Sequence, residues 1–98
     1  MWKFNSLVEL FEDPARWTKN EVARDKDGNS VSESSPRAVS WCFVGGNILL
    51  DDGEFIIRDQ KVDVVLRRRG YFDGIISFNN DPNTTHEMFL DVLKEAQV

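Results

Sequence analysis

Three side chains near one end of the chain could carry acid–base or metal chemistry. Asp81 and Glu87 are carboxylates, and His86 is the chain's single histidine. Histidine is the one side chain whose unperturbed pKa lies near neutrality. A small metal-dependent hydrolase could use these groups, but a metal ion would need at least one more ligand from elsewhere, such as Asp73 or Asp51.

The same segment has a structural interpretation, which we favour. Its spacing matches no metal motif, and His86 and Glu87 are adjacent, so they point in different directions on a helix. Asp81 fixes a turn, Thr84 and Glu87 form a capping box, and His86 lies on or near the surface. We therefore assign no catalytic residue, no metal and no cofactor. The segment remains a candidate polar site made of Asn80, Asp81, Thr84, His86 and Glu87.

Three consecutive arginines stand out against an acidic chain. Arg67, Arg68 and Arg69 fall at the end of a predicted helix, where positive charge complements the helix dipole, and Tyr71 follows closely. A solvated helix end is the structural interpretation. The functional alternative is contact with an acidic partner, RNA or a nucleotide. These four residues are the candidate partner-binding residues.

Three other patterns favour structure over chemistry. Cys42 lies between two aromatic residues in the most apolar segment, where a thiol is buried and protonated. Gly45-Gly46 lies inside a helical run without the strand, further glycines and lysine of a phosphate loop, and so indicates close packing. Residues 25–28 lack the first and last carboxylates of a calcium loop and predict a hairpin turn.

The elements that position these residues form a mainly α (α+β) fold, with about four helices and a small hairpin. Residues 36–50 are apolar on nearly every side and follow a Ser35-Pro36 helix start, which predicts a central helix. Residues 21–31 predict two short extended arms around Asp27-Gly28.

Three further helices pack around the central one. The first begins at Ser6 and stops or restarts at Asp13-Pro14. The next begins with Asp59 as its cap and ends at Gly70, and residues 75–78 are expected to be extended or irregular. The closing helix has one apolar face, made of Phe89, Val92, Leu93 and Ala96.

Composition limits the class of protein. Ninety-eight residues support a single globular domain, residues 1–98. The 17 acidic and 12 basic side chains give a net charge of −5, which disfavours nucleic-acid binding except through the arginines. One cysteine, no secretory signal and no membrane-length apolar run predict a cytoplasmic protein without a membrane partner, either a monomer or a homodimer.

Five segments carry a resemblance to known proteins: Trp17, residues 23–28, residues 35–38, residues 41–46 and residues 80–87. In their order and spacing, they resemble a family of small bacterial and bacteriophage proteins that carry a domain of unknown function. Family members more often have Gly-Ala at positions 45 and 46, and often tryptophan at position 78. The resemblance implies a mainly helical fold and a bacterial or phage origin, and it brings no known activity, cofactor or catalytic residue.

Together these observations favour a non-enzymatic binding or regulatory module whose partner is another protein. No catalytic set converges in the sequence, and the chain is small and acidic. The acidic charge and the resemblance to phage-type proteins suggest one specific form of this function, antagonism of a host system. The alternatives are the metal-dependent hydrolase built on Asp81, His86 and Glu87, and RNA or nucleotide binding through the three arginines.

Overall fold

Helices dominate the computed structural model, which describes residues 4–50 and 52–98. Within these residues there are five α-helices, a 3-10 helix and a three-stranded antiparallel sheet of order β2-β1-β3, so the predicted mainly helical α+β fold is confirmed. The elements are α1 (Leu7–Phe11), η1 (Pro14–Arg16), β1 (Ala23–Arg24), β2 (Ser30–Val31), β3 (Ser40–Trp41), α2 (Phe43–Leu49), α3 (Phe55–Arg68), α4 (Gly74–Asn80) and α5 (His86–Ala96).

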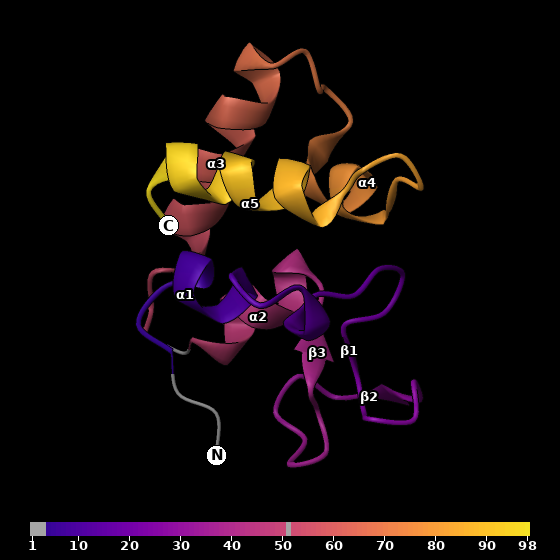
Figure 1. Cartoon of the computed structure of the whole chain (residues 1–98). Helices are drawn as coiled ribbons and strands as arrows, with labels where there is room; N and C mark the ends of the chain where they lie inside the picture. The colour runs from indigo at the N-terminus through magenta and orange to yellow at the C-terminus, as the bar shows by residue number, and fades with distance from the viewer. Residues whose placement is uncertain (1–3, 51) are drawn as a thin grey trace.

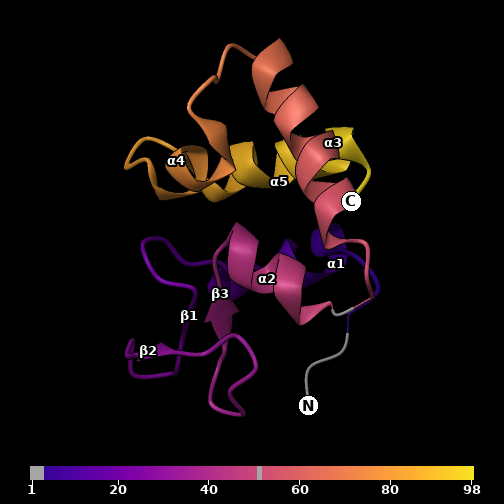
Figure 2. The ribbon, with the colours of Figure 1, turned by 180° about the vertical axis from the view of Figure 1, so that it is seen from behind.

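The elements form two groups, which Figure 1 shows one above the other. Helices α3, α4 and α5 make the upper group, and α1, α2 and the sheet make the lower one. Seen from behind, α2 lies beside β3 and next to the end of α3 at which that helix begins (Figure 2). Among the described residues, no helix combines the length and hydropathy needed to cross a bilayer.

The two N-terminal features predicted from local signals are confirmed. Ser6 Oγ accepts a hydrogen bond from the Glu9 N–H at 3.0 Å and caps α1, which ends before Pro14. The hairpin pairs β1 with β2 through the register Ala23↔Val31. Its turn is closed by Asp25, whose Oδ1 accepts from two backbone N–H groups of the turn.

The predicted central helix over residues 36–50 is wrong in its first half. Ser35 Oγ accepts from the Arg37 N–H, so the Ser35-Pro36 signal makes a turn. Ser40 and Trp41 then pair with β1 as β3, which covers the second edge of that strand. A continuous apolar run is compatible with either a buried strand or a buried helix, and here it contains both.

Helix α2 is the part of that run that remains helical, and it packs tightly, as the glycine pair predicts. A Cβ atom on Gly45 would collide with the backbone carbonyl of Val22, and one on Gly46 would lie 2.6 Å from the Phe11 ring. These contacts are made within the chain. The helix therefore packs directly against the residue before β1 and against α1, with Trp41 fully buried beside it.

Three predicted boundaries in the second half differ from the structure. Asp59 is an exposed residue inside α3, which begins four residues earlier. Residues 75–78 belong to α4, because burial of Phe78 and Asn79 outweighs the weak helix propensity of two isoleucines. The cap of α5 is Thr85, not Thr84. Its predicted apolar face is buried and consists of Phe89, Val92, Leu93 and Ala96.

Candidate functional site

A lysine from the N-terminal half holds the backbone of the predicted polar site. Lys19 Nζ donates to the carbonyl oxygens of Asp81, at 2.5 Å, and of Thr84, at 2.6 Å. The same ammonium lies 5.2 Å from the centroid of the Trp17 ring. The Thr84 side chain is buried. These contacts fix the loop between α4 and α5 against the lower group of elements.

Asn79 is the centre of this arrangement, and the sequence analysis missed it. The buried Asn79 Oδ1 accepts from Trp17 Nε1 at 2.9 Å and from the Phe43 N–H at 3.0 Å. Its Nδ2 donates to Thr18 O and to Asn80 Oδ1. We call the hydrogen bonds that join residues 17–20 to residues 79–84 the polar network. Every polar atom of the Asn79 side chain is used in it.

The catalytic hypothesis required Asp81, His86 and Glu87 to converge, and the structure does not bring them together. His86 Nε2 lies 2.6 Å from the carbonyl oxygen of Phe11, and its ring contacts Trp17. Glu87 is exposed. Asp81 Oδ1 accepts from the Asn83 N–H in a local turn. His86 thus contributes to packing between α5 and α1.

Metal-ligand geometry is also missing from the part of the chain that the structure describes. Within residues 4–50 and 52–98, no three His, Cys, Asp or Glu side chains are grouped so that they could hold a metal ion. Asp51, one of the suggested extra ligands, lies outside the described residues.

Cys42 differs from its prediction as a buried residue inside a helix. It is half-buried, and it caps α2 through a hydrogen bond from the Gly45 N–H to its Sγ at 3.4 Å. The thiol has a local structural partner, and His86 hydrogen-bonds elsewhere, so the two do not form a nucleophile and base pair.

The three arginines lie at the end of α3, as predicted, but two of them are already engaged. Arg67 Nε is 2.9 Å from Asp63 Oδ2, and Arg69 Nη2 is 2.7 Å from Glu95 Oε1. All three arginines are exposed, and one of them, Arg68, is left without an ion pair among the described residues.

Tyr71 is separated from the arginines by the way α3 ends. Gly70 adopts a positive φ of 88°, its N–H donates to Arg67 O, and the Tyr71 N–H donates to Leu66 O at 2.9 Å. These two bonds form a Schellman motif. Gly74, with a φ of 91°, then starts α4. The two glycines turn residues 71–73 away from the helix end and toward α4.

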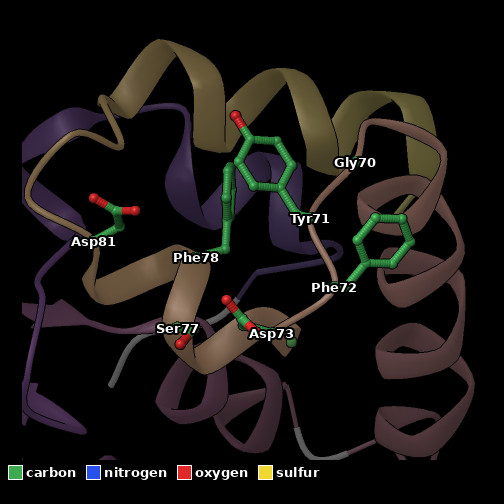
Figure 3. Close-up of a pocket in the computed structure, with 8 residues that line it drawn as sticks. Gly70, Tyr71, Phe72, Asp73, Ser77, Phe78 and Asp81 are labelled. Carbon is green, nitrogen blue, oxygen red and sulfur yellow. The ribbon is translucent and has the colours of Figure 1, made fainter.

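Residues 70–81, which we call the α3–α4 corner, enclose a cavity of about 260 Å³. Figure 3 shows the Tyr71 and Phe78 rings side by side, with Asp81 on one side of them and Asp73 and Ser77 on another. The two ring centroids are 4.9 Å apart in an edge-to-face arrangement. The cavity is lined by Gly70, Tyr71, Phe72, Asp73, Gly74, Ser77, Phe78 and Asp81.

This cavity unites two residues that the sequence analysis had placed in different candidate sites. Tyr71 was grouped with the arginines and Asp81 with His86, yet both line the same hollow. The sequence analysis missed Phe72, Asp73 and Ser77 as site residues. Two glycines four residues apart, around an aromatic pair and an aspartate, are the signal that could have found them.

The groups that line the cavity can bind a ligand, but they are not arranged for acid–base or nucleophilic catalysis. The serine hydroxyl has no histidine or lysine beside it in the lining, and the remaining groups are aromatic rings and two carboxylates. A nucleophile needs a base within hydrogen-bond reach. Aromatic faces with carboxylates are suited to holding a cation.

No protein-family model, no curated protein and no solved structure matches this chain. The resemblance to small bacterial and phage proteins therefore stays a prediction.

Proposed function

We propose that this chain is a non-enzymatic module that docks onto another protein through the α3–α4 corner. One observation carries the proposal. Phe72 and Ile76 are the two most exposed large hydrophobic side chains among the described residues, at 69% and 61%, and both belong to the corner. Exposed apolar side chains gathered beside polar groups mark interaction sites, and aromatic residues are enriched at the centres of interfaces.

Further apolar side chains are exposed on α3, outside the corner. Phe55, Ile56 and Ile57, in the first turn of α3, are each about half exposed, and α3 packs against α4. A surface of this kind costs the isolated protein solubility, because apolar groups in water are unfavourable. A partner protein that covers these exposed side chains removes this cost.

The wider biological role rests on the sequence. An acidic chain with one cysteine, similar to phage-type proteins, fits a cytoplasmic regulator of bacterial or phage origin, and antagonism of a host system is one such role. The hydrolase and the RNA-binding alternatives receive no support from the geometry, since His86 packs against α1 and two of the three arginines are ion-paired.

Affinity capture with matched variants tests this proposal. The corner variant is Phe72→Ser/Ile76→Ser. The control is Ile57→Ser/Val64→Ser, which changes two apolar side chains of α3 that are also about half exposed. We expect one bacterial protein to be retained by the natural chain and by the control, and to be lost with the corner variant, whose fold is checked by circular dichroism. Retention of the same protein by the corner variant, or no protein above background, would contradict the proposal.

A further inference from the structure

We infer that the cavity of the α3–α4 corner receives a basic side chain, lysine or arginine, of the docked partner. The inference rests on the proposed function and adds to it the chemistry of the residue that the partner inserts. It follows from the walls of the cavity, from its charge and from its size.

The walls present aromatic rings to the cavity. Tyr71 is held edge-to-face against Phe78, which is buried and fixed within α4, and Phe72 is the exposed ring of the opening. A cation close to an aromatic face is attracted by the quadrupole of the ring. Because Tyr71 already packs against Phe78, the ligand does not have to order it on binding.

The charge of the cavity is negative and is not neutralised from within. Asp73 is the N-cap residue of α4, yet its carboxylate makes no capping bond, and no hydrogen bond or ion pair joins it to the described residues. Within the described residues, the Asp81 carboxylate accepts only from the Asn83 N–H. No lysine, arginine or histidine is among the lining residues, so two carboxylates face the hollow without a counter-charge in it.

The basic residues nearest in the sequence do not supply this charge, since Arg68, which has no ion pair among the described residues, does not line the cavity. Arg67 is paired with Asp63, and Arg69 with Glu95. Lys19 donates to the backbone carbonyl of Asp81 and not to its carboxylate. Because no basic side chain of the described residues lines the cavity, we assign the complementary positive charge to the docking protein.

The size of the cavity suits one long side chain. Pockets that enclose small-molecule ligands usually have volumes of about 300–1,000 Å³, whereas this one holds about 260 Å³ and is open on one side. That space accommodates one long side chain, with its charged end at the Asp73 carboxylate and its methylene groups against the rings. The exposed Phe72 ring, which lines the cavity, then contacts the partner beside this inserted residue.

The test uses the full chain, labelled with ¹⁵N, and amide chemical shifts as the readout. The probes are Nα-acetyl-lysine methylamide and Nα-acetyl-arginine methylamide, with Nα-acetyl-norleucine methylamide as the uncharged control. We expect both cationic probes to shift amides of residues 70–81, and the norleucine probe to leave them unchanged. No shift with either cation, or an equal shift with norleucine, would overturn the inference.

Two matched variants place the binding in the cavity. Asp73→Asn removes the unpaired carboxylate and keeps its shape, and Asp91→Asn changes an exposed aspartate of α5 outside the cavity. We expect Asp73→Asn to weaken binding about tenfold, as expected for loss of a charged partner, and Asp91→Asn to leave it unchanged. Phe72→Leu, which keeps apolar bulk but removes the ring, is expected to weaken it about threefold. Equal binding by Asp73→Asn and the natural chain would contradict a site at this carboxylate.

The failure of this inference can be told apart from the failure of the proposed function. A captured partner that depends on Phe72 and Ile76 but binds the Asp73→Asn protein normally would keep the docking surface and overturn the basic side chain. Cation binding that depends on Asp73, without any partner that depends on Phe72, would overturn the docking function and leave a site for free amines.

Discussion

Two parts of the molecule that share residues 79–81 differ in whether their polar groups are hydrogen-bonded within the fold. In the polar network, which joins residues 17–20 to residues 79–84, the amide of Asn79 and the ammonium of Lys19 are bound to partners in the fold. In the α3–α4 corner, the Asp73 carboxylate has no such partner, and Phe72 faces solvent. The polar network contains more residue types that could do chemistry, but the side chains of the corner are the ones still free to bind a ligand.

The contrast has a thermodynamic basis. A buried polar group without a partner costs about 1–3 kcal/mol. The polar groups that become buried on folding are therefore hydrogen-bonded to other groups of the protein. No buried side-chain nitrogen or oxygen atom is left without a hydrogen bond among the described residues. Polar groups that can still form a hydrogen bond with a ligand are therefore found at the surface. The cavity of the α3–α4 corner brings such groups together.

The largest effect is expected from Asn79→Ala. This change leaves the Trp17 Nε1–H and the buried Phe43 N–H without an acceptor, so we expect the free energy of unfolding to fall by about 3 kcal/mol. Urea denaturation followed by tryptophan fluorescence measures it. A loss below about 1 kcal/mol would show that water replaces Asn79 easily, and that the polar network is not a folding element.

Lys19→Met is expected to have an intermediate effect. Methionine keeps much of the apolar length of lysine but cannot donate to the carbonyl oxygens of Asp81 and Thr84. Loss of two bonds from a charged donor at a partly exposed site is expected to cost about 1.5 kcal/mol. Thermal denaturation checks the value, with Lys61→Met on the exposed face of α3 as the control. Equal stability of the two variants would contradict a holding role for Lys19.

Gly70→Ala tests how the corner is positioned. A Cβ atom there would meet nothing within 4 Å, but the residue has a positive φ, so the cost is conformational and is expected to be about 1 kcal/mol. Gly70→Asn should cost less, because asparagine tolerates this conformation better. Equal stability of the two variants in urea would mean that the backbone rearranges and that the corner is not fixed by this glycine.

The smallest effect is a pH dependence at Asp52, outside the corner. A side-chain hydrogen bond from Arg58 holds the pKa of this carboxyl below its usual value, and the Glu54 N–H acts in the same direction. A carboxyl with a lowered pKa in the folded state stabilises the protein above its unfolded pKa of about 4, and this contribution is lost as the pH falls through the folded pKa. Asp52→Asn should therefore flatten the fall in stability below about pH 4. Unchanged slopes in urea titrations at several acidic pH values would contradict the contribution.

The sequence predicts the elements that depend on local signals and misses those that depend on distant partners. Ser6, the Asp27-Gly28 turn and the apolar face of α5 are local, and these predictions are confirmed. The strand at Ser40 and Trp41 exists because β1 offers a free edge, which an apolar run does not reveal. Helix α4 depends on the burial of Phe78 and Asn79 against elements far away in the chain.

The contacts of the candidate site were harder still to predict, because they join residues that are far apart in the sequence. The bond between Lys19 and Asp81 joins residues 62 positions apart, and the bond between Trp17 and Asn79 spans the same separation. Nothing in the sequence shows that these pairs are engaged with each other. The residue types between positions 80 and 87 therefore suggested chemistry that the fold uses for packing, whereas Tyr71 and Asp81 were named without the cavity that joins them.

The central claim is that Phe72 and Asp73, the exposed side chains at the cavity of the α3–α4 corner, serve binding and contribute little to folding. The most direct measurement is the free energy of unfolding of Phe72→Ser/Asp73→Asn, determined in urea beside the natural chain. We expect the two proteins to agree within about 0.5 kcal/mol, because one side chain is largely exposed and the other has no partner. A loss of about 2 kcal/mol or more would show that these side chains hold the fold together, and would contradict the account.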